Sequence, residues 1–322
     1  MQTLRNILLT LLALLGLLFI GLPQLPASIA GYFIFLTLCA APFVLLLLLV
    51  EIGLFIWTKS RWRWIFGILL IGCLSVLSNH LPIPNQQEKG NQSSLRLLSW
   101  NVTNFHIHPD TLQKAATFIR SLQPDLICLQ ERPHENLLSW EAIQAAFPEY
   151  PYALRNEERE DEVLNMAILS KYPLAEKAET YYNDSYNKTM AVNVAAPGRT
   201  FRIHNTHLQT THHVFTRFIG NAQRRNAQAD YLKRQTRLHD LPTLICGDFN
   251  DTPCSYTYRT LSAGMQDAFL KGTTQWTGSF QPMGRWLRID YILCSDDWNV
   301  LEYQLIENPW SDHKMQLAIL NY

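Results

Sequence analysis

Two short segments combine side chains that phosphate chemistry uses. Gly247-Asp248-Phe249-Asn250-Asp251 follows an apolar run at 241–246, and Ser311-Asp312-His313 lies near the C-terminus. The apolar run is typical of a buried strand, so the polar residues after it would stand at the end of that strand. Carboxylates, amides and imidazoles placed in this way can hold a hard divalent cation and activate water. The two segments therefore favour metal-assisted cleavage of a phosphate ester.

Other apolar segments of the chain also carry polar residues at their ends, and these segments are 98–101, 129–131, 205–208 and 288–291. Loops at strand ends are where a rigid scaffold displays reactive groups. Taken alone, each residue has an ordinary structural explanation: Asn101 could form a turn, His207 lies among other histidines, and Asp248 could cap the next turn. The joint occurrence of these segments favours one shared site over a series of coincidences.

The N-terminal quarter of the chain differs from the rest, because apolar runs cover 7–22, 32–57 and 62–77. A membrane span needs roughly 20 apolar residues, so about three transmembrane helices are expected within 1–80. The first run could instead be a signal peptide, since Arg5 precedes it and small residues at 28–30 follow it.

Positive charge sets the expected orientation of these helices. The turn at 59–64 carries three basic residues, whereas the turn at 23–31 carries no charge. Basic turns tend to stay in the cytoplasm, so the chain after the third run is expected on the other side. The polar stretch 81–94 is typical of a flexible linker. This organisation leaves 95–322 as the extracytoplasmic catalytic domain of a multi-pass plasma-membrane protein.

Composition restricts the partners of the protein. The net charge of the whole chain is zero, with +3 on residues 1–95 and −3 on the remainder. A domain this close to neutrality has no broad basic face, which argues against sequence-independent binding of DNA. The six cysteines contain no C-x-x-C pair, so neither a zinc site nor a disulfide framework is expected. No feature of the sequence calls for an obligate protein partner.

The soluble part mixes short apolar runs with a few amphipathic ones. Helices are expected at 112–122, with Asp110 as the N-cap, at 135–147 and at 216–239. Strands are expected at 96–102, 125–130, 163–170, 190–196, 200–205, 241–246, 288–294 and 315–320. Because strands also follow one another directly, a simple repeated βαβ fold is disfavoured. This order fits two packed sheets covered by helices.

Taken together, the motifs of residues 95–322 resemble those of the endonuclease/exonuclease/phosphatase superfamily, which includes enzymes like deoxyribonuclease I. The motifs, in family order, are Ser99-Trp100-Asn101-Val102, Gln130-Glu131, Ala167-Ile168-Leu169-Ser170-Lys171-Tyr172-Pro173, Asn205-Thr206-His207-Leu208, Gly247-Asp248-Phe249-Asn250, Arg288-Ile289-Asp290-Tyr291-Ile292 and Ser311-Asp312-His313. The resemblance implies a metal-dependent phosphoesterase. It also implies a four-layered α/β sandwich of two packed mixed sheets flanked by helices, here preceded by an N-terminal transmembrane helical region.

The resemblance further implies a metal site. Glu131, supported by Asn101 and Asp312, would hold Mg²⁺ through oxygen ligands, with Mn²⁺ as an alternative. Asp312 would bind the ion directly or through water. The bound ion would neutralise a phosphate oxygen and stabilise the leaving oxyanion.

Other residues would act on the phosphate and on the attacking water. Asp248 would align or deprotonate that water. His313 would contact the scissile phosphate while Asp290 accepts its other N–H and fixes its tautomer. Asn250 would donate to the phosphate, and His207 would donate to the phosphate or help to protonate the leaving group. Whether Asp248 or His313 is the base stays open.

Three functions remain open at this level. The first is hydrolysis of a lipid or small-molecule head group, which tethering to a bilayer would favour. In having a histidine at position 207, the chain resembles the deoxyribonuclease I, sphingomyelinase and inositol-phosphatase branches of the superfamily more than the abasic-site repair branch. The second function is an extracytoplasmic endo- or exonuclease, in which the basic helix at 217–237 would follow a nucleic-acid backbone. The third is a non-catalytic ligand-binding module on the same fold.

Overall fold

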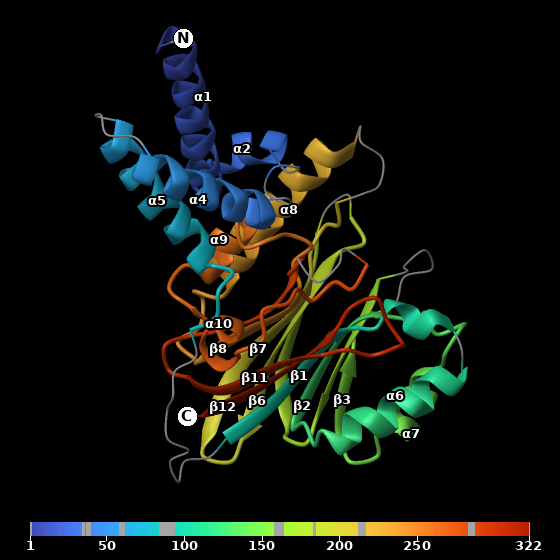
Figure 1. The fold of residues 1–322 in the computed structure, drawn as a ribbon. Helices are drawn as coiled ribbons and strands as arrows, with labels where there is room; N and C mark the ends of the chain where they lie inside the picture. Colours follow the sequence, from blue (N-terminus) through green and yellow to red (C-terminus); the bar gives the residue numbers. More distant parts are fainter. Residues whose placement is uncertain are drawn as a thin grey trace.

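Two β-sheets stand face to face with helices on their outer faces, and a separate group of helices lies beyond one end of the sheets (Figure 1). The computed structural model describes residues 2–33, 36, 40–57, 62–83, 94–107, 109–157, 164–182, 185–211, 217–282 and 287–321. We call the described residues up to 83 the helical region and those from 94 onward the sandwich domain. The expected four-layered α/β sandwich is confirmed.

The first sheet has the strand order β11-β12-β1-β2-β4-β3. Within the described residues β1 and β2 are its one parallel pair, and the other neighbours run antiparallel. Its strands are β1 (Ser94–Asn101), β2 (Leu126–Arg132), β3 (Tyr152–Arg155), β4 (Asn165–Ser170), β11 (Asn299–Ile306) and β12 (Met315–Asn321).

The second sheet has the strand order β5-β6-β7-β8-β10-β9, and in its described part only β7 and β8 pair in parallel. Its strands are β5 (Leu174–Tyr181), β6 (Lys188–Ala196), β7 (Arg199–His207), β8 (Thr243–Asp248), β9 (Gln266–Asp267) and β10 (Asp290–Cys294). Each sheet thus has a parallel pair near its middle, which brings the carboxyl ends of two strands to one edge.

Alternation of side chains along the strands builds the layers. Leu97 points into the apolar core between the sheets, and its neighbour Leu98 packs under helices on the outer face of the first sheet. Helices α8 and α9 cover the outer face of the second sheet around Phe249. The helices of the sandwich domain are α6 (Pro109–Ser121), α7 (Trp140–Ala146), α8 (Phe218–Gln235), α9 (Tyr256–Ser262) and α10 (Ala268–Gly272), with a 3₁₀ turn η3 at Thr103–Ile107.

The starts of two helices differ from the predicted positions. The sequence predicts Asp110 as the N-cap of α6, but Asp110 lies inside the first turn of the helix. The helix predicted at 135–147 begins only at Trp140, because the Ser139 side chain accepts a hydrogen bond from the Ala142 N–H and caps the helix there. In both cases the first polar residue of an amphipathic pattern is a poor guide to the cap.

Strands β3, β5, β9 and β11 were not predicted. The side chains of β3 are exposed or half-buried, and β5 is largely exposed. Both strands lie at sheet edges, where one side of the backbone lacks a partner and apolar patterning is weak. Residues 58–61, 84–93, 163 and 216, on which parts of the predicted turn, linker, strand and helix fall, lie outside the described residues.

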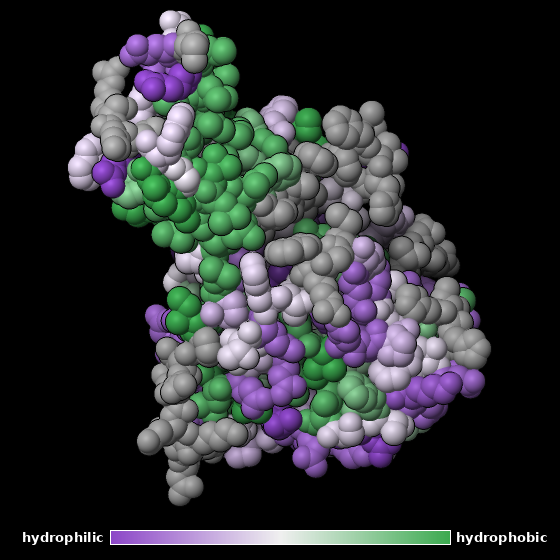
Figure 2. Space-filling view, viewed as in Figure 1, coloured by the Kyte–Doolittle hydropathy of each residue, from purple (hydrophilic) through white to green (hydrophobic). Residues whose placement is uncertain are grey.

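The helical region consists of α1 (Gln2–Gly21), η1 (Leu22–Gln24), α2 (Ala27–Ala30), η2 (Gly31–Phe33), α4 (Ala40–Trp57) and α5 (Trp62–Ser78). Apolar side chains dominate its surface, whereas the visible face of the sandwich domain is mixed (Figure 2). Within the described residues α1 alone is long and apolar enough to cross a membrane, and a signal sequence would look the same. The prediction of a multi-pass protein with three spans is therefore not supported, because within the described residues one helix is a candidate span and α4 and α5 contribute shorter apolar segments.

Candidate active site

Four strands from both sheets end at one place, and each ends in a polar side chain. Asn101, His207 and Asp248 are the last residues of β1, β7 and β8, and Glu131 lies one residue before the end of β2. The Asn101 Nδ2 lies 2.9 Å from Glu131 Oε1 and 3.1 Å from Asp248 Oδ2. His207 Nε2 lies 3.4 Å from Glu131 Oε1 and 3.6 Å from Asp248 Oδ2. Residues far apart in the sequence thus surround the Asp248 carboxylate.

Asp290 reaches the same place by another route. The sequence predicts that Asp290 follows an apolar segment, but it is the first residue of β10. Because β10 runs antiparallel to β8, with Asp290 opposite Asp248, the beginning of one strand lies beside the end of the other. His313 precedes β12, and its Nδ1 lies 3.0 and 3.1 Å from the two Asp290 oxygens. Its Nε2 faces Asp248 Oδ2 at 3.8 Å.

The backbone around His313 is fixed by neighbours that carry no charge. Its carbonyl oxygen accepts hydrogen bonds from Trp100 Nε1 at 3.1 Å and from Asn308 Nδ2 at 2.8 Å. Its N–H donates to Ser311 Oγ, and Phe280 packs edge-on against the ring with centroids 5.1 Å apart. The imidazole is therefore held between Asp290 and the central carboxylate.

Unusual backbone conformations occur where the chain turns into the site. Glu131 has φ of 52°, beside an irregularity in the pairing of β2 with β4, and Asn250 has φ of 53°. Gly247 has φ of 126°, and a Cβ there would lie 2.0 Å from the Thr206 carbonyl oxygen. Such conformations cost free energy and persist where the surrounding structure enforces them. Here they turn Glu131 and Asp248 toward the common centre.

Charge is concentrated in a buried space, and pKa values respond to it. Burial raises the pKa of Asp248, and the charges of Asp290 and Glu131 raise it further, to about 8, although His313 opposes them. Burial alone would lower the pKa of His313, but Asp290 and Asp248 outweigh it and raise that pKa to about 10. Burial lowers the pKa of His207 against the opposing charge of Glu131.

Two groups in this space have the chemistry to hold a cation. Glu131, His207 and Asp248 offer ligand atoms within 4.8 Å of one another, as do Asp248, Asp290 and His313. Among the residues that the structure describes, both ring nitrogens of His207 are buried without a hydrogen-bond partner, which is costly unless another group satisfies them. Crowded carboxylate oxygens suit a hard divalent ion such as Mg²⁺ or Mn²⁺. The side chains therefore fit the cation that the resemblance implies.

Two predicted residues lie at the margin of the site. Asp312 belongs to neither of these groups, and Thr103 Oγ1 donates to its Oδ1 at 2.5 Å. The Asn250 side chain donates to the Leu208 carbonyl at 3.0 Å, and its N–H donates to Asp248 Oδ1 at 2.7 Å. Their roles toward metal and phosphate stay predictions.

Several supporting residues belong to the predicted motifs but were given no role of their own from the sequence. Gln130 Nε2 donates to Asn205 Oδ1 at 2.7 Å across the two sheets, and to Ser99 Oγ at 3.2 Å. Asn205 Nδ2 in turn donates to the Leu129 and Ala167 carbonyls of the first sheet. This buried amide pair links the sheets next to the strand ends that carry the site. A signal was available, because Gln130 directly precedes Glu131 and Asn205 lies two residues before His207.

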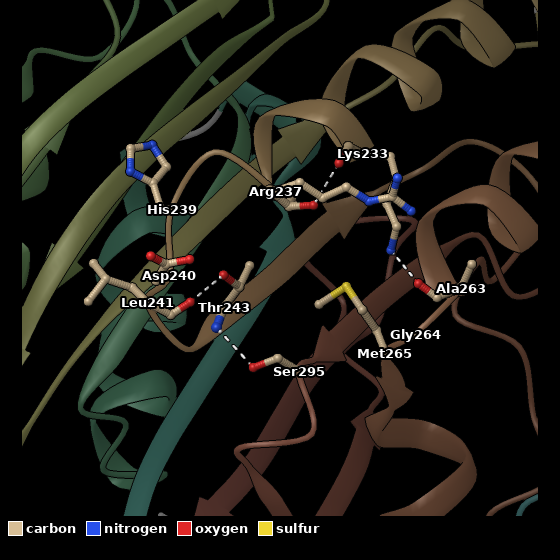
Figure 3. Close-up of a pocket in the computed structure, with 11 residues that line it drawn as sticks. Lys233, Arg237, His239, Asp240, Leu241, Thr243, Ala263, Gly264, Met265 and Ser295 are labelled. Atoms are coloured by element: carbon tan, nitrogen blue, oxygen red, sulfur yellow. Dashed lines mark hydrogen bonds between the residues drawn. The ribbon is translucent and has the colours of Figure 1, made fainter.

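The cavity in Figure 3 is separate from the candidate active site. It has a volume of about 360 Å³ and is lined by Lys233 and Arg237 near Thr243, where β8 begins. The site residue Asp248 ends that strand, roughly 17 Å further along at about 3.3 Å per residue. Lys233 Nζ donates to the Ala263 carbonyl just after α9, which is an ordinary helix-capping contact. None of the predicted site residues lines this cavity.

Comparison with known proteins identifies the class. The sequence model of the Endonuclease/Exonuclease/phosphatase family matches residues 98–313. The chain therefore belongs to this family, and it is an enzyme of the phosphoesterase class that the family name describes. No curated protein matches the chain significantly.

Similar solved structures cover the sandwich domain. An endonuclease/exonuclease/phosphatase protein from Bacteroides vulgatus has 19% identity and a TM-score of 0.57, over 71% of this chain and 99% of that one. The mannosyl-6-phosphatase of Bacteroides thetaiotaomicron has 17% identity and a TM-score of 0.56, over 71% and 100% of the two chains. Truncated Caenorhabditis elegans TDP2 has 16% identity and a TM-score of 0.56, over 71% and 98%. At these identities the likeness shows the fold.

Proposed function

We propose that the protein is a divalent-metal-dependent hydrolase of phosphate esters, with its site at the shared ends of β1, β2, β7 and β8. One observation carries this proposal: polar atoms of Asn101, Glu131, His207, Asp290 and His313 gather around the Asp248 carboxylate. In our proposal Glu131 holds Mg²⁺ or Mn²⁺, with Asn101 and Asp312 in support. When bound, the ion would neutralise charge on the phosphate.

The remaining side chains would position water and phosphate. In this proposal Asp248 aligns the attacking water and receives its proton, and His313 donates from Nε2 to a phosphate oxygen. Asp290 accepts the other N–H of the ring and so favours the imidazolium, in which Nε2 also carries a proton. His207 would donate to the phosphate or to the leaving oxygen, and Asn250 would donate to the phosphate from the rim.

The proposed substrate is a lipid or small-molecule head group at a bilayer. Exposed apolar residues cover the helical region, including Leu4, Ile68 and Trp64, the last of which is 74% exposed. A bilayer would remove this surface from water, at about 25 cal/mol for each Å². Tethering would then raise the local concentration of a membrane-borne substrate.

The proposed orientation keeps the sandwich domain outside the cytoplasm. The residues that follow α1 and α5 both meet the sandwich domain, through Arg259 to Gln24 of η1 and Arg288 to Asn79. The basic residue Arg5 lies at the other end of α1, far from the sheets in Figure 1. Basic residues at the distal ends agree with a cytoplasmic location for those ends. An extracytoplasmic nuclease remains the second candidate, supported by basic residues such as Arg224 and Arg234 on α8.

Substrate profiling tests the proposal. Purified full-length protein in detergent is assayed against phospholipid vesicles, single- and double-stranded DNA and small phosphomonoesters, with Mg²⁺ and with EDTA. We expect Mg²⁺-dependent release of phosphate or head group, abolished in Glu131→Gln. The matched control is Glu149→Gln, which alters an exposed carboxylate paired with Arg120 and should retain activity.

The possible outcomes separate the candidates. Cleavage of DNA alone, lost in Glu131→Gln, would favour the nuclease. A folded protein that turns over no substrate would favour a binding module. Hydrolysis that persists in EDTA and in Glu131→Gln would contradict the metal site. Proteolysis of sealed cells tests orientation, since an extracytoplasmic domain is digested without permeabilisation.

A further inference from the structure

Polar contacts join the helical region to the sandwich domain at defined points. Arg288 Nη2 donates to the Asn79 carbonyl oxygen at 3.0 Å, just beyond the end of α5. Arg259 Nη2 donates to the Leu25 carbonyl oxygen at 3.0 Å, beyond the end of η1. The Ile83 N–H donates to the sandwich domain at 2.9 Å. The two parts are thus packed against each other with specific hydrogen bonds.

Apolar packing forms a second connection between the two parts. Cys254 belongs to the same buried cluster as Leu47, Val76 and Leu77 of the helical region, and its Sγ lies 3.8 Å from the His80 ring. Cys254 follows Asp248 in the segment that leaves β8. The segment that begins with a site residue therefore ends in contact with the helical region.

Arg288 is buried inside the sandwich domain, which a residue that only attaches the helical region would not need to be. Its side chain is 3% exposed, and Nη1 donates to Asp267 Oδ2 at 2.6 Å. The guanidinium packs over the rings of Phe269 at 4.5 Å and Tyr291 at 4.6 Å. A buried arginine is tolerated only where its donors are satisfied, and here Asn79 of the helical region supplies one acceptor.

The chain leads directly from Arg288 to the reacting groups. The Arg288 carbonyl accepts a hydrogen bond from Tyr291 Oη at 2.8 Å, and the N–H groups of Ile289 and Asp290 both donate to Ser279 Oγ at 3.0 Å. These bonds fix the backbone between Arg288 and Asp290. A shift of the guanidinium would be passed along this short segment to the carboxylate that orients His313.

We propose that the helical region is part of the catalytic apparatus, and that Arg288 is a positioning residue through which its docking sets the Asp290–His313 pair. This inference rests on the proposed function for its kinetic readout. In this proposal the helical region affects the geometry of the site as well as the location of the protein.

The test uses full-length protein reconstituted in nanodiscs. Arg288→Lys keeps a cation for Asp267 but lacks a second nitrogen to reach Asn79. We expect kcat to fall roughly tenfold with KM changed by less than about threefold, because a hydrogen bond from a charged group is lost and the reacting pair is displaced. His80→Ala removes the ring that contacts Cys254, one residue after the Asn79 acceptor, and leaves the sandwich sequence intact, so kcat should fall in the same direction.

Arg259→Gln is the matched control, because it also removes an arginine contact to the helical region but lies on α9 rather than next to Asp290. It should leave kcat within about twofold of wild type. Proton NMR gives a second readout, since the His313 Nδ1 proton shared with Asp290 should shift in Arg288→Lys and His80→Ala and stay in place in Arg259→Gln.

The inference is overturned if Arg288→Lys and His80→Ala keep wild-type kcat and an unshifted proton. It is also overturned if Arg259→Gln lowers kcat as much as they do. If the wild-type protein shows no phosphoesterase turnover, the proposed function fails separately. The NMR comparison then still decides whether docking sets the pair.

Discussion

Replacing Asp290 with Asn should disable the His313 imidazole while leaving its surroundings in place. Both Asp290 oxygens lie within 3.1 Å of His313 Nδ1, and the two side chains are 1% and 5% exposed. The shape of Asn is almost the same as that of Asp, but its amide nitrogen can donate to Nδ1. Such a bond would leave Nδ1 unprotonated and the ring neutral, so His313 would face the phosphate without the positive charge that Asp290 sustains.

The size of the effect follows from burial and charge. A hydrogen bond between a charged carboxylate and a ring N–H contributes about 1.5–3 kcal/mol. At 1.36 kcal/mol for each factor of ten, Asp290→Asn should lower kcat by roughly 10- to 150-fold. The loss should fall mainly on kcat, because Asp290 reaches the substrate only through His313.

Steady-state hydrolysis of a chromogenic phosphodiester in Mg²⁺ measures this loss, and circular dichroism verifies the fold. Asp297→Asn is the matched control, since that carboxylate is 52% exposed and pairs with Arg199 at the surface; it should change kcat by less than about twofold. A folded Asp290→Asn variant with wild-type kcat would refute the role that we assign to the Asp290–His313 pair.

Two further predictions concern stability. Gly247→Ala should cost about 3 kcal/mol or more, because its φ of 126° excludes a side chain and the new Cβ would meet the Thr206 carbonyl. Gly220→Ala on α8, where nothing lies within 4 Å of a Cβ, should be neutral or stabilising; equal melting temperatures for the two variants would contradict this reasoning. Burial, with help from nearby cations, lowers the pKa of His204 to about 3, so the folded chain keeps this imidazole neutral while the unfolded chain binds a proton near its usual pKa of about 6.5. The stability contributed by His204 is therefore present above about pH 6.5 and lost at roughly 1.4 kcal/mol per pH unit as the pH falls toward 3; a His204→Gln variant should lose less melting temperature between about pH 7 and pH 5 than wild type, and identical losses would count against it.

The sequence reveals the parts of the fold in which burial leaves a strong pattern. Strands β1, β2, β4, β7 and β8 are almost entirely buried, and all of them were predicted. In β1, β2, β4 and β8 this burial is visible as a short apolar run, which is usual for central strands. Edge strands such as β5 expose most side chains, so their pairing depends on neighbours that no local pattern displays. The confirmed sandwich thus rests on its interior strands.

The candidate site was predicted from residue types, whereas its geometry depends on topology. Nothing local to Asp290 indicates whether it ends a strand or begins one, and only the antiparallel pairing of β10 with β8 places it beside Asp248. The local sequence likewise does not show which serine hydroxyls support the site. Ser279 looks like an ordinary turn residue until the chain brings it against the backbone of Asp290, and Ser311 belongs to a predicted motif but was given no role of its own.

The energetics of the site explain why these neutral residues matter. Burial and the charges of the neighbouring carboxylates together raise the pKa of Asp248 to about 8, and the repulsion between these carboxylates opposes folding. Neutral amides and hydroxyls can stabilise the arrangement without adding charge, as the Gln130–Asn205 pair does across the sheets. The hydrogen bond between Arg288 and Asn79 of the helical region adds a further restraint on the segment that leads into β10. Because the site groups repel one another, each element that packs against them and restrains them contributes to the geometry of the site. The helical region is one such element in our proposal, although its composition alone indicates only a membrane segment.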